Sequence, residues 1–210
     1  MEGNAMSNMS NMYVKFSRPV TWEGEQYEGI DLSGLAKMTV KDAIEVQKIG
    51  AKKNSTAVAV MPELSTLFMM LLASKAADMP IEFFQALPVR AGREVRKVVQ
   101  SAIRLGNEDE ETEEDNAAVM KLTKPYAWQD ESYTEIDLSG LAKLNTMNVI
   151  EADERLIKEG TPVAETSYLY AALLASMATG KPEEFFTGMP LSEAGNLKAA
   201  VRNADEGFFE

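Results

Sequence analysis

The chain of 210 residues contains neither cysteine nor histidine. Without cysteine there is no disulfide framework, no thiolate nucleophile and no thiolate ligand for a metal. Without histidine, the commonest general base and the commonest metal-binding side chain are missing as well. Every catalytic arrangement that needs an imidazole or a thiol is therefore excluded. We expect a protein that is not an enzyme and that uses no metal or other cofactor.

Long apolar runs and phosphate-binding loops are missing too. No run reaches the length of about 18 apolar residues that indicates a membrane-spanning helix. No N-terminal segment with a basic start and an apolar centre indicates a signal peptide. The 13 glycines form neither GxGxxG nor GxxxxGK[ST], the patterns that bind phosphates. We therefore expect neither a membrane segment nor a nucleotide site.

Basic residues are in deficit. The net charge is −12, from 21 basic and 33 acidic side chains, whereas a surface that binds nucleic-acid phosphates needs a basic excess. Nucleic acid and anionic membranes are therefore not expected as partners. Residues 108–115 hold seven acidic groups and no basic one. Such a segment is typical of an extended, disordered linker; an acidic ligand for a basic partner is the alternative.

What the chain does contain is an internal repeat. Residues 13–47 align without gaps on residues 119–153, an offset of 106, with 15 of 35 positions identical. The run IDLSGLAK at 30–37 returns unchanged at 136–143. A period of this length has the size of a small domain, because solenoid repeats span about 20–50 residues. The repeat therefore predicts two homologous modules in tandem.

A second block confirms the duplication and locates the difference between the copies. Residues 71–88 align on residues 173–190, now at an offset of 102, with 10 of 18 positions identical. The first copy therefore carries four extra residues, near residues 51–61. Together with the acidic run, the blocks predict five parts: a flexible tail 1–12, a first module 13–104, an acidic linker 105–118, a second module 119–206 and a C-terminal tail 207–210.

The first part of each module has the pattern of a β-hairpin. Apolar residues alternate up to Trp22, a turn follows at 23–26, and residues 27–32 supply the return strand. Pro19 and its counterpart Pro125 cannot donate to a β-ladder, so we expect them at an edge or a bulge. The repeated Asp31 and Asp137 are expected to anchor the next turn through backbone amides.

The second part of each module has helical signals. A first helix is predicted over about 40–50 and 146–159, with Thr39 and Asn145 as N-caps and with Gly50 and Gly160 at the ends. Three further helices are expected to begin at prolines. The second helix follows Pro62 and Pro162 and carries one apolar stripe, and Gly180 ends it in the second copy. A short helix follows Pro80 and Pro182, and a last one follows Pro88 and Pro190. The fold class is therefore α+β, with each module a hairpin followed by three to four helices.

Apolar side chains are the only candidate binding residues. The aromatic residues that recur in both copies fit a shared core better than a binding site. Met69, Met70 and Met79 cluster around the second helix of the first copy, and methionine suits surfaces that accept varied partners; core filling is the alternative. Phe208 and Phe209 lie outside the repeat. They are interpreted either as a docking motif or as part of a frayed end.

Three motifs of the second copy point to a family. They are KLTKP at 121–125, YTEIDL at 133–138 and ATGKPE at 178–183. With the spacing between them, the chain resembles the tail assembly chaperones of long-tailed phages, in particular those of contractile-tailed phages and prophages. The first copy matches less well, and such chaperones usually have one module.

The resemblance implies a non-enzymatic protein of the bacterial host cytoplasm. Such a protein would bind the tape measure protein, keep it soluble and help to recruit tail tube subunits. We expect the client to bind in apolar grooves between each hairpin and its helices, with the tether between two modules raising avidity. The alternative is a structural or interaction protein of a virion or prophage, including an acidic mimic of nucleic acid.

Overall fold

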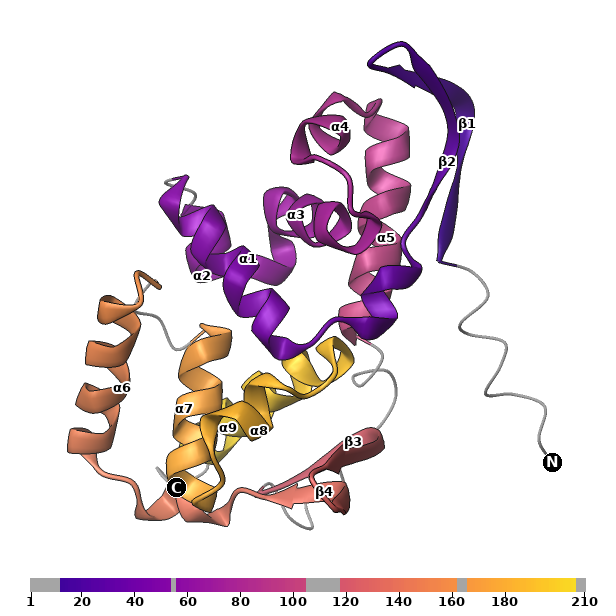
Figure 1. Ribbon diagram of the computed structural model, residues 1–210. Coiled ribbons are helices and arrows are strands. Elements are labelled where there is room, and N and C mark those ends of the chain that lie inside the picture. Colours follow the sequence, from indigo (N-terminus) through magenta and orange to yellow (C-terminus); the bar gives the residue numbers. More distant parts are fainter. Residues whose placement is uncertain (1–11, 54–55, 105–117, 162–165, 207–210) are drawn as a thin grey trace, which may run out of the picture.

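The computed structural model describes residues 12–53, 56–104, 118–161 and 166–206. Within these residues the protein is α+β and mostly helical, with two separate two-stranded antiparallel hairpins and a set of surrounding helices (Figure 1). The predicted fold class is thus confirmed. The division into two homologous modules stays a prediction. The acidic run and both predicted tails lie outside the described residues, apart from Met12.

We call residues 12–104 the first half and residues 118–206 the second half. The elements of the first half are β1 (Tyr13–Trp22), β2 (Glu25–Asp31), η1 (Ser33–Lys37), α1 (Val40–Lys52), α2 (Thr56–Val60), η2 (Pro62–Leu64), α3 (Thr66–Ala77), α4 (Ile81–Ala86) and α5 (Val89–Arg104). Those of the second half are β3 (Val119–Trp128), β4 (Glu131–Asp137), η3 (Ser139–Lys143), α6 (Thr146–Lys158), α7 (Tyr168–Thr179), α8 (Glu183–Thr187), η4 (Leu191–Glu193) and α9 (Ala194–Glu206).

The two hairpins have the same register. Tyr13 pairs with Asp31 in the first, and Val119 pairs with Asp137 in the second. In each hairpin the register shifts over the segment that contains the proline, at 15–20 and at 121–126. The bulge predicted from the missing amide of proline is therefore confirmed in both hairpins.

The turn after each hairpin is also built the same way. The carboxylates of Asp31 and Asp137 each accept a hydrogen bond from the backbone amide two residues later, at 2.8 Å. The next residue is glycine for a steric reason. A Cβ on Gly34 would lie 2.1 Å from the Ala76 carbonyl oxygen, and one on Gly140 would lie 1.9 Å from the Ala178 carbonyl oxygen. The repeated Ser-Gly pair therefore lets a tight turn approach α3 and α7.

Three predicted helix boundaries are wrong, and Pro162 lies outside the described residues. Pro190 opens the 3-10 turn η4 rather than the last helix, which begins at Ala194. Helix α1 does not end at Gly50 but continues to Lys52, and Gly50 instead provides space for Val58 of α2. Pro62 opens a short 3-10 turn rather than the second helix, which begins at Thr66 with Ser65 as its N-cap. The ends at Gly160 and Gly180 are confirmed, because both have positive φ directly after their helices.

Helices α3 and α7 lie at the centre of the molecule. The predicted single apolar stripe is wrong for α3, where six consecutive residues from Phe68 to Ala73 are buried. In α7 all eight residues from Tyr168 to Ala175 are buried. A helix that is apolar on all sides must be surrounded by other elements. The main neighbours of α3 belong to the first half, whereas α7 is surrounded by elements of the second half and by α1 of the first. The Phe68 and Tyr168 rings connect the two helices.

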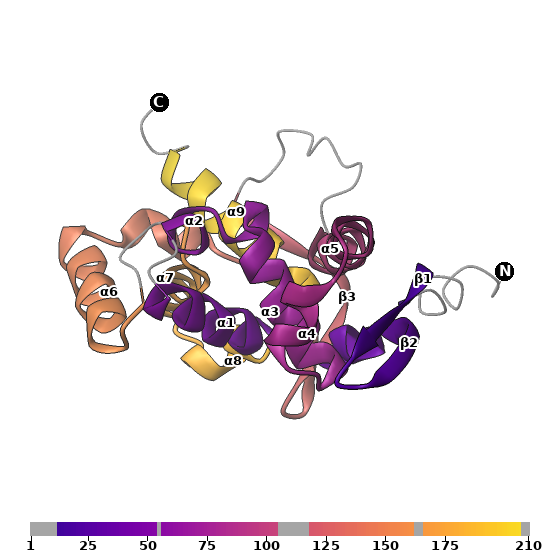
Figure 2. The ribbon, with the colours of Figure 1, turned by 90° about the horizontal axis from the view of Figure 1, so that it is seen from above.

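The views in Figures 1 and 2 agree on how the halves meet. Helix α1 of the first half lies beside α7 and α8 of the second half. Helix α5 contacts η4 and α9. The hairpins lie on the outside, well apart from each other (Figure 1).

Candidate functional site

The junction between the halves begins with a short backbone pairing. The amide of Val40 donates to the carbonyl of Met189, and the amide of Leu191 donates to the carbonyl of Met38, both at 2.9 Å. Thr39 and Pro190 thereby form an antiparallel β-bridge. This pairing joins the start of α1 to the start of η4.

A buried glutamine of α1 contacts the start of α7. The Gln47 side-chain oxygen accepts hydrogen bonds from the Tyr168 amide at 3.3 Å and from the Ser167 hydroxyl at 3.5 Å. The Tyr168 ring stacks on Phe68 of α3, with 5.9 Å between ring centroids. Gln47, Phe68 and Ser167 are all completely buried. The junction is therefore part of the interior of the protein.

Charged groups close one side of the junction. Glu63 of η2 accepts hydrogen bonds from the Tyr168 hydroxyl at 2.7 Å and from the Lys198 ammonium at 2.5 Å. Burial, followed by the charge and hydrogen bond of Glu63, raises the pKa of Tyr168 well above its usual value. Burial lowers the pKa of Lys198, although the Glu63 carboxylate opposes this shift. The Lys198 ammonium also lies 4.6 Å from the centre of the Tyr168 ring.

A second ion pair joins α1 to the end of α6. The Lys48 ammonium contacts the Glu159 carboxylate, which Arg155 also contacts. Burial alone would raise the pKa of Glu159, but the hydrogen bond and charge of Lys48 and the charge of Arg155 lower it below its usual 4.5.

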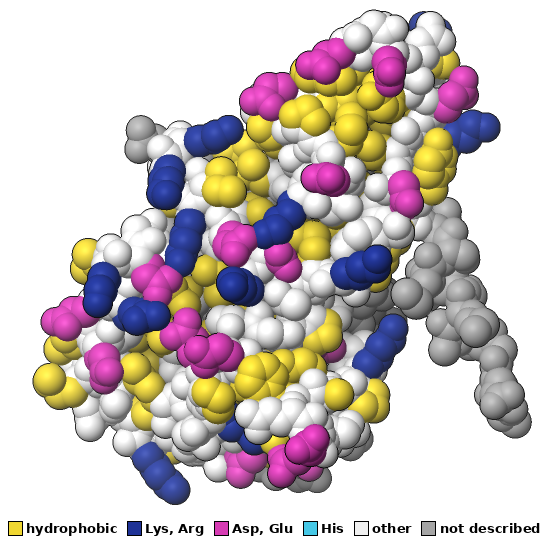
Figure 3. Space-filling model, in the orientation of Figure 1, with side chains coloured by type: hydrophobic (Ala, Val, Ile, Leu, Met, Phe, Trp, Pro, Cys, Tyr) yellow, Lys and Arg dark blue, Asp and Glu magenta, His cyan; other side chains and the backbone are white. Residues whose placement is uncertain are grey.

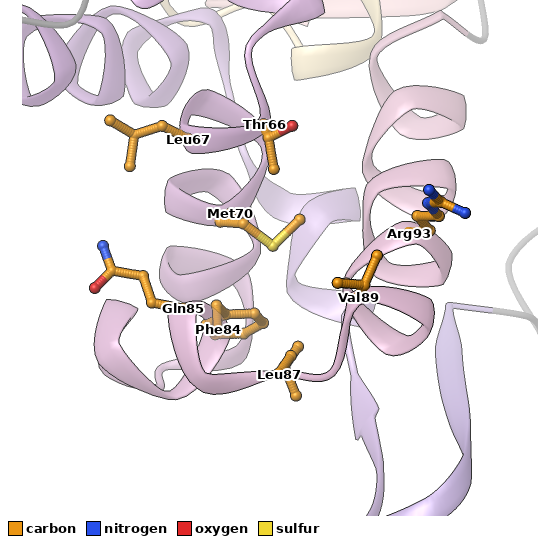
Figure 4. Close-up of a pocket in the computed structure, with 9 residues that line it drawn as sticks. Thr66, Leu67, Met70, Phe84, Gln85, Leu87, Val89 and Arg93 are labelled. Atoms are coloured by element: carbon orange, nitrogen blue, oxygen red, sulfur yellow. The ribbon is translucent and has the colours of Figure 1, made fainter.

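The first half has an open apolar groove between α3, α4 and α5, with a volume of about 400 Å³ (Figure 4). Met70 and Phe84 form its floor, and Val89 stands on its rim opposite Leu67. The lining residues are Thr66, Leu67, Met70, Phe84, Gln85, Leu87, Val89, Gly92 and Arg93. We call this surface the open groove.

The aligned surface of the second half is covered. At the offset of 102, the positions of Leu87 and Val89 correspond to Met189 and Leu191. Val89 is 72% exposed, whereas Leu191 is 3% exposed because η4 lies against α5, α1 and η1 of the first half. We call the covering side of the first half the α1 face; its residues are Met38, Val40, Ala43, Ile44 and Gln47.

The aligned side of α6 has no such cover. At the offset of 106 it consists of Leu144, Thr146, Val149, Ile150 and Asp153, which we call the α6 face. Ile150 is 42% exposed, whereas the aligned Ile44 is 4% exposed. Among the described residues, one groove is therefore covered while its counterpart is open, and one helix face is docked while its counterpart is largely exposed.

The hairpins pack on aromatic side chains. Trp22 and Tyr27 contact the ring of Phe83, and Trp128 and Tyr133 contact Phe185 in the same way, with ring centroids 5.0–6.0 Å apart. The rings thus fill the space between each hairpin and its short helix. Phe83, Phe84, Phe185 and Phe186 belong to the core, whereas Trp22, Tyr27, Trp128 and Tyr133 are half-buried against it.

The outer surface above these rings differs between the halves. In the first half Met79, Ile81, Trp22 and Tyr27 are all half-buried against the apolar core, and apolar side chains gather over α4 and the neighbouring hairpin (Figure 3). We call Trp22, Tyr27, Met79 and Ile81 the hairpin–α4 face. In the second half, Lys181 aligns with Met79 and Glu183 aligns with Ile81. The Lys181 ammonium lies 4.2 Å from the centre of the Tyr133 ring.

The candidate residues from the sequence lie in different places. Met69 is completely buried, which fits core filling. Met70 is 5% exposed and lines the open groove. Met79 is half-buried on the hairpin–α4 face. Phe208 and Phe209 lie outside the described residues. Of the three methionines, which the structure describes, no two therefore share one surface.

Sequence reasoning missed the open groove and the α6 face. Their signal was present in the alignment of the two copies, where Leu191 and Val89 are both apolar, as are Ile44 and Ile150. Which of the paired positions is covered follows only from the way the halves meet. Within the described ranges, no group of three acidic residues could hold a metal ion, and no helix is long and apolar enough to cross a membrane.

Searches of protein-family models, characterised proteins and solved structures find no match to this chain.

Proposed function

We propose that the protein is a non-enzymatic tail assembly chaperone of a phage or prophage, which binds the tape measure protein in the bacterial cytoplasm. We propose further that the chain is a duplicated module in which the first copy contacts the client. The three sequence motifs support the family. The equal hairpin registers and the aligned Gly34 and Gly140 support the duplication.

The proposed client site is supported by the difference between the hairpin–α4 face and the aligned surface of the second half. Met79 and Ile81 are apolar and half-buried against the same core as Trp22 and Tyr27. Lys181 and Glu183 replace this pair with charges at the aligned positions. An apolar client segment can cover the surface of the first half without removing a charged group from water. Covering the aligned surface of the second half would desolvate Lys181 and Glu183. Adaptable methionine and large aromatic side chains suit clients of varied sequence.

The test exchanges these residues between the copies. The variant Met79→Lys/Ile81→Glu gives the first half the residues of the second. Co-expressed with the tape measure protein, it should keep much less client soluble than the natural chain. The reverse variant, Lys181→Met/Glu183→Ile, is the matched control and should retain the effect. The proposal fails if the client is equally soluble when this protein is omitted.

A further inference from the structure

The exposed Ile150 and Val89 are the counterparts of two side chains that are buried at the junction between the halves. We infer that the protein associates with a second copy of itself, head to tail, by placing the α6 face of one copy in the open groove of the next. The contact would repeat between chains the junction that already exists within one chain. This inference does not depend on the proposed function.

The backbone groups needed for the contact are available. Within the chain, Val40 and Met38 exchange hydrogen bonds with Met189 and Leu191. The aligned groups are the Thr146 amide and Leu144 carbonyl on the α6 face. In the open groove they are the Leu87 carbonyl and the Val89 amide. In the described part of the chain, none of these four groups has a hydrogen-bond partner. The same two bonds can therefore form between two chains.

The apolar side chains of the α6 face match those of the α1 face. Leu144 aligns with Met38, and Ile150 aligns with Ile44. Val149 is larger than the Ala43 that it replaces. In the facing groove, the small Thr66 stands where the second half has Tyr168. The α6 face thus carries a larger side chain and the open groove a smaller one, and changes of opposite size are the ones that a packed contact tolerates best.

The polar contact at the centre changes in a compatible way. Gln47, which accepts the Tyr168 amide within the chain, is replaced by Asp153. The aligned amide is that of Thr66, at the start of the 12-residue helix α3. The Arg96 guanidinium lies close by, donating to the Thr66 hydroxyl at 3.3 Å. A carboxylate is favoured over an amide at this place, because it faces both a helix N-terminus and a fixed cation.

The peripheral ion pair is preserved with its signs reversed. Within the chain, Lys48 of α1 contacts Glu159 at the end of α6. Because α1 and α6 have the same length, Lys48 corresponds to Glu154, and the C-cap Glu159 corresponds to the C-cap Lys53. Both are exposed. A head-to-tail contact therefore brings Glu154 of one copy to Lys53 of the next. Exchange of both charges keeps the attraction, whereas a change of either one alone would remove it.

The contact has no twofold symmetry, because the two surfaces are different. Helix α6 lies at the lower left of Figure 1, and α4, which borders the open groove, lies at the top. One copy can therefore use both surfaces at once. A heterologous interface of this kind produces a closed ring or an open chain of copies rather than a simple dimer.

The test measures mass by sedimentation from about 10 µM to about 1 mM, a range that covers weak interfaces. The natural chain should exceed monomer mass as its concentration rises. Val89→Glu blocks the open groove, and Ile150→Glu blocks the α6 face. Both side chains are exposed, so both variants should retain the circular dichroism spectrum of the natural chain. Each variant alone should remain monomeric, whereas their equimolar mixture should form a 1:1 dimer with one intact contact.

Three results would overturn the inference: a natural chain that stays monomeric at about 1 mM, variants that still self-associate alone, or a mixture that stays monomeric. The exposed Tyr13 on the hairpin is the control, and Tyr13→Glu should leave self-association unchanged. A second measurement uses the charges. Lys53→Glu and Glu154→Lys should each weaken association several-fold, and the double variant should restore it. Without restoration, Glu154 and Lys53 do not meet and the proposed geometry is wrong.

Discussion

Ile44 and Ile150 occupy the same position of the repeat, yet one is buried and the other is exposed. Their helices have the same length and similar caps, Thr39 and Asn145. The difference comes from what lies opposite. Helix α1 meets the second half, whereas the aligned side of α6 faces solvent. The comparison shows that duplicated local structure does not determine burial, which depends on which copy lies against which.

The largest expected effect comes from Tyr168 and its aligned residue Thr66. Tyr168 is buried between the halves and stacks on Phe68, so Tyr168→Ala should lower the free energy of unfolding by about 3–5 kcal/mol. Thr66 is exposed, and Thr66→Ala should change it by less than about 0.5 kcal/mol. Urea unfolding of both variants measures the difference. Equal losses would mean that Tyr168 does not connect the halves.

Gly34 and Gly140 are aligned, and substitution of either should lower the stability of the protein to the same extent. A Cβ on Gly34 or on Gly140 would collide with a backbone carbonyl at nearly the same distance. Gly34→Ala and Gly140→Ala should therefore each destabilise the protein, by about 2 kcal/mol. Gly92→Ala is the control, because nothing lies within 4 Å of its added Cβ and the site is helical. Thermal unfolding should show a slight gain in stability for that variant.

The third prediction concerns acid. The pKa of Glu159 is lowered in the folded protein, so its ion pair with Lys48 contributes stability above the unfolded pKa of about 4.5. This contribution should be lost as the pH falls through the lower, folded pKa. Urea midpoints from pH 7 to pH 3 should fall less steeply for Glu159→Gln than for the natural chain. Glu151→Gln, an exposed carboxylate of the same helix, should leave the slope unchanged.

The smallest effect is expected where α3 and α7 end. Asp78 and Gly180 both have the left-handed conformation, with φ of 51° and 71°. Asp78→Gly should stabilise the protein by about 1 kcal/mol, and Gly180→Ala should destabilise it by a similar amount. Calorimetry of the two variants tests this opposite sign. Two changes of the same sign would show that the two helix ends are not equivalent.

Much of the local structure could be predicted from the sequence because its causes are local. Pro19 and Pro125 lack an amide, which leads to a bulge in each hairpin, and Asp31 and Asp137 accept hydrogen bonds from residues only two positions away. The errors arose where a distant segment decides the outcome. Gly50 has the pattern of a helix end, but Val58 packs on it and α1 continues. Pro62 likewise opens only a short turn, because Ser65 caps the next helix.

The candidate surfaces could be predicted only in part. The cluster of Met69, Met70 and Met79 was visible in the sequence, but the three side chains lie in the core, in the open groove and on the hairpin–α4 face. Helix α3 is apolar on all sides, so its sequence does not indicate which side meets the second half. The open groove exists because no described segment lies on it as α1 lies on the second half. That asymmetry is a property of the assembled chain.

The central claim is that the α1 face of the first half is seated on the second half. The most direct measurement introduces a specific protease site between residues 107 and 116, cleaves the folded protein and determines its mass. The Phe68–Tyr168 stack, the paired backbone bonds and the Glu63–Lys198 ion pair should hold the fragments together. We predict a 1:1 complex with the mass of the uncut chain. Fragments that separate while remaining folded would contradict the account.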